Sequence, residues 1–362
     1  MAGSVTDDDK HGLGDWDPST KKLPKGLSYI AKEALKRKVG FGIWLEPEMV
    51  NPQSELYQKH PDWIITQSKR EPILGRHQEI LDLTRPEVQA FEWDIIDKTL
   101  RPNPDITYVK WDCNRYITQP GSSYLQPADQ SHLWIDYNRA LYRLMDRFAK
   151  GFPNVMAMLC AVDYGAMPYF HSFWPSDNTD PLGRIKIQWG FSHFFPANTI
   201  SAHVTRMGKR HLKMAIDVAL SGAFGIDLAL DKATAEERAQ IADAVKLYKE
   251  RIRPLVMHGE LYRLVSPYES PLASLSYVST DKQKAVVYFY QTKDGNEPRV
   301  MLGGLAAQKQ YRVEEVSLAT GATSRFPANG KVFTGAELME KGLENPLNTQ
   351  FESAVLILVA NN

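Results

Sequence analysis

The stretch "TYVKWDCNRY", residues 107–116, starts as an apolar strand and turns polar halfway along. Its first residues are β-branched or aromatic, which favours a strand, and then Lys110, Trp111 and Asp112 follow in succession. Because side chains alternate along a strand, Lys110 and Asp112 point to the same side. A Lys-x-Asp triplet on its own is common and is best explained as a surface ion pair, so its meaning depends on the sequence around it.

Helical and strand-like segments alternate around this stretch, from about residue 24 to residue 232. Such strand–helix repeats predict parallel strands covered by helices. A closed (β/α)8 barrel needs eight strands. An open doubly wound sheet also fits the alternation, but no G-x-G-x-x-G loop follows a strand. Periodicity predicts helices over 24–40, 85–102, 133–153 and 234–259, and six strands comprising the quoted stretch and 41–49, 154–160, 170–177, 198–204 and 223–230.

The pattern changes after about residue 262, where long helical segments give way to short strands separated by Gly, Asn, Asp and Lys. This pattern of short strands and turn residues predicts a small antiparallel β-sandwich. We therefore expect an α/β, TIM-like barrel domain over 1–262 and a β-sandwich domain over 263–362. The predicted strands of the second domain are 272–279, 284–292, 299–304, 311–317 and 353–360.

The overall composition excludes several classes of partner. Acidic and basic residues balance at 43 each, so nothing favours a nucleic acid or an anionic membrane. Two cysteines make no disulfide framework and fit a reducing compartment. The sequence has no secretory h-region and no apolar window of the ~18 residues that a membrane span needs. We expect a cytoplasmic protein.

Acidic residues follow several of the predicted strands, and Trp44 and Trp174 lie beside two of them. In a barrel, the carboxyl ends of the strands face the active site. Carboxylates among aromatic rings fit glycoside chemistry, in which one carboxylate attacks or stabilises the anomeric centre and another protonates the leaving oxygen. The acidic candidates are Glu46, Glu48, Asp112, Asp177, Asp180 and Asp227.

The segment "WPSDNTD", residues 174–180, is the most specific of these signals. Asp177 and Asp180 are close enough to interact, and a neighbouring carboxylate makes a carboxyl group hold its proton more tightly, as an acid catalyst must. The segment also fits an Asx turn that caps the next helix. Both interpretations hold together if one aspartate caps and the other catalyses. For Asp112, the neighbouring cation Lys110 favours the ionised form that a nucleophile needs.

Other segments are better explained by a structural role than by a catalytic one. In "EPE", Glu46 and Glu48 rival the aspartates as catalysts, but Pro47 fixes the turn and a rigid, hydrogen-bonded loop is the better interpretation. Cys113 is expected to be a small buried hydrophobic residue. Without an H-E-x-x-H or C-x-x-C motif, we expect no metal and no other cofactor.

A series of motifs in this order resembles the bacterial α-galactosidases of glycoside hydrolase family 36, the raffinose and melibiose type. The resemblance runs from about Asp7 to the C-terminus. The motifs are "GLGDW", "FGIWLEPEMV", "HPDW", "GRHQEILDL", "YVKWDCNR", "FWPSDNTD", "RIKIQWGFSHFFPANTISAHV" and "ALSGAFGIDL".

The resemblance implies a retaining, double-displacement mechanism. Asp112 would be the nucleophile of the K-W-D motif and Asp177 the acid/base of the S-D-x-x-D motif. In such enzymes the two carboxyl groups lie roughly 5 to 5.5 Å apart. The resemblance also implies substrate-binding roles for Trp44, Arg76, Lys110, Cys160, Trp174 and Asp180.

The sequence departs from the family pattern in two places. Family members usually have a large N-terminal β-sandwich and two barrel strands ahead of "GLGDW", and the second strand carries paired aspartates for galactose O4 and O6. Here "GLGDW" begins at Gly12, so we expect an incomplete barrel with weaker discrimination among sugars. The family also has a Gly-rich run after its cysteine, whereas Ala161 follows Cys160 directly.

Three functions remain open at this level. The first is hydrolysis of terminal α-galactosides such as melibiose and raffinose. The second is sugar binding by a truncated, catalytically impaired relative. The third keeps the hydrolysis but shifts the sugar, because the residues that select galactose are missing. The first two have small galactosides as partners, and a homo-oligomer in which a partner covers the open strand edges is compatible with each function.

Overall fold

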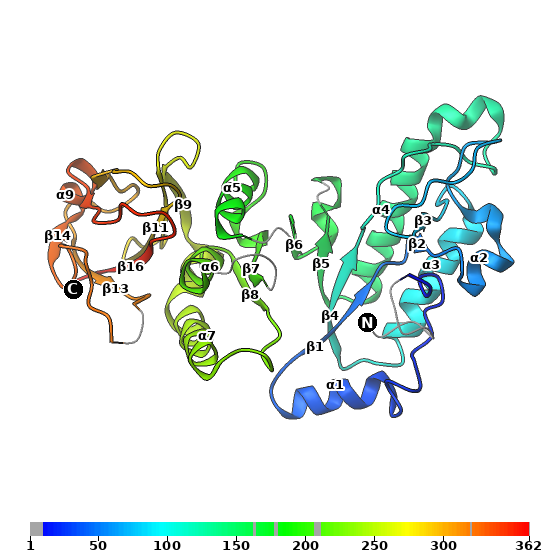
Figure 1. Cartoon of the computed structure of the whole chain (residues 1–362), viewed down its shortest axis with the longest axis horizontal. Helices are drawn as coiled ribbons and strands as arrows, with labels where there is room; N and C mark the ends of the chain where they lie inside the picture. The colour runs from blue at the N-terminus through cyan, green and yellow to red at the C-terminus, as the bar shows by residue number, and fades with distance from the viewer. Residues whose placement is uncertain (1–9, 162–163, 177–179, 206–210, 319–320, 362) are drawn as a thin grey trace. The chain divides into compact units, whose positions relative to one another are not determined.

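The computed structural model describes residues 10–161, 164–176, 180–205, 211–318 and 321–361. It divides into two compact units, Met1–Phe173 (unit 1) and Trp174–Asn362 (unit 2). Figure 1 labels their helices and strands. In the part of the chain that is described, no helix combines the length and apolar character needed to cross a membrane.

A parallel sheet with the strand order β1-β4-β5-β6 forms the centre of unit 1. The quoted stretch contributes β4, which pairs with β1 on one side and β5 on the other. Trp44 lies opposite Lys110, and Asp112 lies opposite Cys160. The strands are β1 (Phe41–Leu45), β4 (Ile106–Asp112), β5 (Met156–Cys160) and β6 (Ser172–Phe173).

Helices cover the apolar side of this sheet. The buried residues of α4 recur at helical spacing from Leu133 to Phe148, so they form one stripe. Trp111 of β4 is fully buried and contacts the rings of Phe148 and Phe170 edge-on, each with a centroid distance of 6.0 Å. The helices of unit 1 are α1 (Gly26–Lys36), α2 (Glu55–Lys59), α3 (Pro86–Leu100) and α4 (Leu133–Gly151), with 3-10 turns η1 (Pro61–Trp63), η2 (Pro127–His132) and η3 (Tyr164–Tyr169).

One antiparallel pair in unit 1 has no signal in the sequence pattern. It consists of β2 (Met49–Val50) and β3 (Glu79–Ile80). Strands of two residues are too short to show periodicity, and this pair lies in the segment between β1 and α3. It ties the "EPE" segment to the "GRHQEI" segment.

Unit 2 begins with the remaining two of the six predicted parallel strands, β7 (Ser201–Thr205) and β8 (Ala223–Asp227), which pair with each other. Thr234 and Glu237 form a capping box at the start of α7. The predicted helix after it contains a π-helical turn, because Pro254 has no N–H to continue the α-helical ladder. The helical elements are α5 (Pro181–Phe191), η4 (Ala197–Thr199), α6 (Leu212–Ala219), α7 (Ala235–Leu247), η5 (Tyr248–Ile252) and α8 (Arg253–His258).

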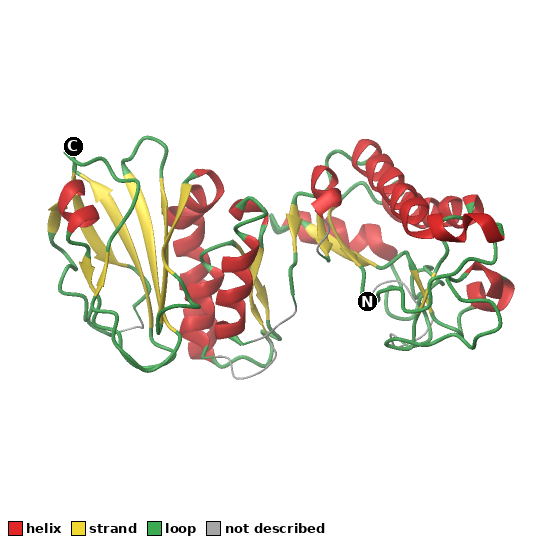
Figure 2. Ribbon diagram, turned by 90° about the horizontal axis from the view of Figure 1, so that it is seen from above, coloured by secondary structure: helices red, strands yellow, loops and turns green. Residues whose placement is uncertain are grey.

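A six-stranded antiparallel sheet, in the order β14-β13-β16-β11-β10-β9, completes unit 2. One face packs against α6 and α8, and the other packs against a thin layer that includes α9 (Gly335–Glu340) (Figure 2). The expected sandwich is therefore one large sheet with a small second layer. The strands are β9 (Glu260–Val265), β10 (Leu272–Val278), β11 (Lys284–Gln291), β13 (Gln310–Glu315), β14 (Val332–Thr334) and β16 (Ser353–Ala360), with the separate pair β12 (Arg299–Val300) and β15 (Leu343–Glu344).

Four tyrosine hydroxyls fix the end of α6 within unit 2. Each donates a hydrogen bond to a backbone carbonyl in the last turn of α6 or in the connection to β8. Carbonyls at a helix end lack partners within the helix, so these bonds satisfy groups that would otherwise be buried and unpaired. The pairs are Tyr290 to Asp217 O at 3.1 Å, Tyr288 to Leu220 O at 2.9 Å, Tyr277 to Ser221 O at 2.8 Å and Tyr248 to Gly222 O at 2.9 Å.

These bonds predict that Tyr288→Phe destabilises unit 2. The variant keeps the ring but leaves the Leu220 carbonyl unpaired, which costs about 1–3 kcal/mol in a buried site. Urea unfolding should show this loss, whereas Tyr268→Phe, at a side chain that is 64% exposed, should change the unfolding free energy by less than about 0.5 kcal/mol. Equal effects of the two variants would contradict this role for the hydroxyl.

Candidate active site

Asp112 lies at the end of β4 with both carboxylate oxygens engaged. The Trp44 indole Nε1 donates to Oδ2 at 2.7 Å, and the backbone N–H of Cys113 donates to Oδ1 at 3.0 Å. The Lys110 Nζ lies 4.0 Å from Oδ2, so the cation and the carboxylate are on the same side of the strand. The carboxylate is buried, and these groups fix its orientation while each oxygen keeps a further lone pair.

Two further predicted residues lie in the same unit. Cys160, half-buried, is the register partner of Asp112 on the neighbouring strand. Arg76 is exposed and adopts a left-handed conformation with a φ of 54°. Its guanidinium donates to the Asn114 side chain, two residues beyond Asp112. Unit 1 therefore brings together Trp44, Lys110 and Asp112, with Cys160 beside them and Arg76 linked through Asn114.

The "EPE" segment is buried and hydrogen-bonded, as expected for a rigid loop. The Glu46 Oε1 accepts from the backbone N–H of Asn114 at 2.8 Å, and its Oε2 accepts from the Gln78 amide at 3.4 Å. Burial raises the pKa of Glu46 to about 7, and the nearby charge of Asp112 acts in the same direction, against the Asn114 hydrogen bonds and the Arg76 charge. Glu46 is thus a carboxyl group poised between its two protonation states beside Asp112.

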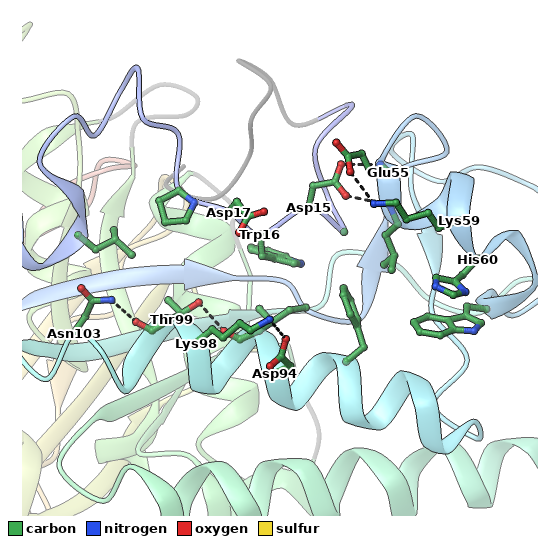
Figure 3. Close-up of a pocket in the computed structure, with 17 residues that line it drawn as sticks. Asp15, Trp16, Asp17, Glu55, Lys59, His60, Asp94, Lys98, Thr99 and Asn103 are labelled. Carbon is green, nitrogen blue, oxygen red and sulfur yellow. Dashed lines mark hydrogen bonds and ion pairs between the residues drawn. The ribbon is translucent and has the colours of Figure 1, made fainter.

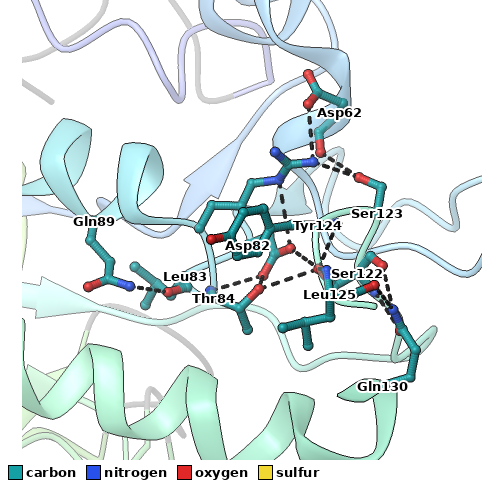
Figure 4. Close-up of polar contacts among 11 residues, drawn as sticks. Asp62, Asp82, Leu83, Thr84, Gln89, Ser122, Ser123, Tyr124, Leu125 and Gln130 are labelled. Atoms are coloured by element: carbon teal, nitrogen blue, oxygen red, sulfur yellow. Dashed lines mark hydrogen bonds and ion pairs between the residues drawn. The ribbon is translucent and has the colours of Figure 1, made fainter. Parts of the chain in front are cut away.

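A buried aspartate holds the loop that follows β4. The Asp82 Oδ1 accepts from the Thr84 N–H at 3.0 Å and from the Thr84 hydroxyl at 2.6 Å, while its Oδ2 accepts from the Ser122 hydroxyl. The Gln130 amide in turn donates to the Ser122 and Leu125 carbonyls (Figure 4). The chain leaving Asp112 is therefore anchored to the segment before α3.

The remaining predicted residues belong to unit 2 or lie outside the described residues. Trp174 stacks on His203 with a centroid distance of 3.6 Å. The Asp180 Oδ1 accepts from the Gly183 N–H at 2.8 Å and so forms the N-cap of α5, which fits the expected capping turn. Asp177 lies outside the described residues, so its position relative to Asp112 remains a prediction.

Sequence reasoning missed some contributors to the site. No role was predicted from the sequence for Asn114 or Gln78, although both lie within quoted motifs and Asn114 follows Asp112 by only two residues. Cys113 differs from the expectation of a buried hydrophobic residue: it is half-buried, and its thiol donates to the Glu48 Oε1 at 3.2 Å. Hydrogen-bond partners of this kind come from segments far apart in the chain and have no local signal.

A cavity of about 440 Å³ lies elsewhere in unit 1, between residues 14–18, α2 and α3 (Figure 3). Its charged groups are mostly engaged with each other or with backbone. The Lys59 Nζ lies 2.9 Å from the Glu55 Oε2, and the Lys98 Nζ lies 2.5 Å from the Asp94 Oδ2. Asp15 accepts from N–H groups at the start of α2. We therefore place the chemistry at Asp112 rather than in this cavity.

A carboxylate at the carboxyl end of a parallel strand has the position of a catalytic residue in a barrel enzyme, and glycoside hydrolysis uses carboxylates in this way. Residues 3–259 match the melibiase family model, and residues 272–358 match the model for the C-terminal domain of glycosyl hydrolase family 36. The chain belongs to glycoside hydrolase family 36, the family of α-galactosidases that the sequence motifs resemble.

Individual relatives agree with this assignment. The α-galactosidase AgaA of Geobacillus stearothermophilus is 38% identical over 94% of this chain and 46% of its own length. The α-galactosidase 2 of Hypocrea jecorina is 33% identical over 97% of this chain and 47% of its own length. A crystal structure of a doubly substituted AgaA variant with raffinose is 36% identical and superposes with a TM-score of 0.88 over 98% of this chain and 49% of that chain. The chain thus spans about half the length of these relatives, and the fold is that of the family's barrel domain followed by an antiparallel sheet domain.

The raised pKa of Glu46 predicts a pH-dependent stability. Burial favours the protonated form, so the stabilisation is present below the unfolded pKa of 4.5 and is lost as the pH rises to about 7. Glu46→Gln has no proton to lose, so the unfolding free energy of the wild type relative to this variant should fall by about 3 kcal/mol over that range. Urea unfolding at several pH values measures this difference, and parallel pH profiles for the two proteins would contradict it.

Proposed function

We propose that this chain carries the catalytic residues of a retaining α-galactosidase that releases terminal α-galactose from oligosaccharides of the melibiose and raffinose type. The observation that carries the proposal is the buried Asp112 carboxylate, oriented by Trp44 and the Cys113 N–H with Lys110 beside it. Family membership supports the reaction class. Solved structures of AgaA variants in complex with raffinose and stachyose support the substrate class.

In this proposal Asp112 is the nucleophile. One of its oxygens attacks the anomeric carbon, the glycosidic bond breaks and a galactosyl ester forms. Asp177 protonates the leaving oxygen and then takes a proton from the water that hydrolyses the ester. The Trp44 hydrogen bond selects which lone pairs of Asp112 remain for the attack, and holding that geometry is a large part of catalysis.

Other residues would bind the sugar. Lys110 can donate to galactose hydroxyls, and the rings of Trp44 and Trp174 can wall the pocket. Arg76 and Cys160 are further pocket positions. Asp180, as the N-cap of α5, would fix the start of that helix and so support the segment that carries Asp177. No metal or organic cofactor has a part in this chemistry.

Replacing the nucleophile gives the first test. Asp112→Asn keeps the shape of the side chain but removes the attacking charge, so kcat for an aryl α-galactoside should fall by about 10⁴-fold or more. Asp146→Asn, at a half-exposed carboxylate on α4, is the matched control and should retain full activity. A rate that Asp112→Asn leaves unchanged would remove Asp112 from the mechanism. If the wild type binds galactose in calorimetry without turnover, the sugar-binding alternative holds instead.

Two substrates with different leaving groups distinguish the general-acid role of Asp177 from the nucleophile role of Asp112. Asp177→Ala should lose most of its activity on raffinose, whose sugar leaving group needs a proton, and much less on a galactoside of an acidic nitrophenol. The measurement is kcat/KM for both substrates in both proteins. Equal losses on the two substrates would contradict a role as general acid.

A further inference from the structure

Glu48 is buried behind the nucleophile, and three donors converge on its carboxyl group. Its Oε1 accepts from the Trp111 indole Nε1 at 3.2 Å and from the Cys113 thiol at 3.2 Å. Its Oε2 accepts from the Tyr137 hydroxyl at 2.8 Å. The side chain does not contact Asp112 in these bonds. It holds the residue before Asp112 and the residue after it.

This arrangement determines where β4 ends. Trp111 is fully buried against the helices, and side-chain alternation puts Asp112 on the opposite side of the strand. A shift of Trp111 or Cys113 therefore moves the backbone that carries Asp112. Tyr137 belongs to α4, so the bond to Glu48 Oε2 links this strand end to the helical layer.

A second buried carboxyl group beside Glu48 has a different environment. Glu92, on α3, is fully buried, and among the described residues neither of its oxygens has a hydrogen-bond partner. Burial raises the pKa of Glu92 well above its ordinary value, and the negative charge of Glu48 adds to this effect. Burial therefore favours the protonated form of Glu92, and Glu92 makes no bonds to the strand end, whereas Glu48 accepts from three donors.

We infer that Glu48 is a positioning residue for the nucleophile: by holding Trp111 and Cys113 it fixes the place and orientation of the Asp112 carboxylate. This inference rests on the proposed function, in which Asp112 attacks the anomeric carbon. A displacement of about 1 Å in a reacting group can cost about 100-fold in rate. Loss of the Glu48 contacts should therefore slow the bond-forming step while sugar binding by the pocket residues persists.

The test measures the nucleophile directly. A 5-fluoro-α-galactosyl fluoride reacts once with a retaining enzyme: an Asp112 oxygen bonds to the anomeric carbon, the C–F bond breaks and fluoride leaves with the electron pair. Mass spectrometry of the peptide containing Asp112 gives the rate of ester formation. Calorimetry with galactose gives binding separately, and a purely structural defect would lower both.

Three variants give the expected pattern. Glu48→Gln should slow the labelling of Asp112 by about 10- to 100-fold with unchanged galactose affinity. Tyr137→Phe removes one of the three donors without altering Glu48 itself, and it should slow labelling by a smaller factor in a stably folded protein. Glu92→Gln makes the same chemical change at the neighbouring buried carboxyl group, and it should label at the wild-type rate.

The outcomes separate the inference from the proposed function. A wild-type protein that is neither labelled nor active overturns both. A wild type labelled at Asp112, with folded Glu48→Gln and Tyr137→Phe variants labelled equally fast, overturns the inference and leaves the proposed function intact. If Glu48→Gln does not fold, the Tyr137→Phe variant tests the inference instead. Slower labelling of Tyr137→Phe with intact galactose binding supports the inference, and labelling of this variant at the wild-type rate overturns it.

Discussion

The alternation of side chains along β4 is the constraint on which unit 1 depends. Trp111 must be on the side of the helices, where it is fully buried, and this places Lys110 and Asp112 on the other side. A buried indole still needs an acceptor for its N–H, and Glu48 supplies it. The packing of one tryptophan thus accounts both for the side of the strand on which Lys110 and Asp112 lie and for the buried Glu48 on the other side.

The carboxyl groups around this strand show how environment divides similar side chains among different tasks. Asp112 is bonded by an indole and a backbone N–H and lies near a cation. Glu46 accepts from the Asn114 N–H and the Gln78 amide, and its burial raises its pKa to about 7. Glu92 lacks hydrogen-bond partners among the described residues, and burial raises its pKa well above the ordinary value. The hydrogen bonds that each carboxyl group accepts and the depth of its burial, rather than its residue type, distinguish the environments of these three groups.

The sequence predicted the elements whose periodicity is strong. The helix with the buried stripe of α4 and five of the six parallel strands follow from local pattern and are confirmed, whereas the strand predicted over 170–177 is limited to β6, Ser172–Phe173. The two-residue strands β2 and β3 have no period to detect, and the π turn before α8 depends on a single proline.

For the site, local sequence placed Lys110 and Asp112 on one side of a strand. It could not show the bond from Trp44 to Asp112, which joins residues 68 positions apart, or the three donors that meet at Glu48. The roles of Asp177 and the sugar-binding residues remain predictions.

The tyrosines that bond to the end of α6 bear on how this architecture can change over evolutionary time. Three of them come from β10 and β11 of the C-terminal segment, whereas α6, β8 and the π turn that carries Tyr248 belong to the melibiase segment. One continuous apolar core contains residues of both segments. A recombination event that exchanged the C-terminal segment for one from an unrelated protein would strip three carbonyls of their donors, so the two segments are suited to inheritance as a pair.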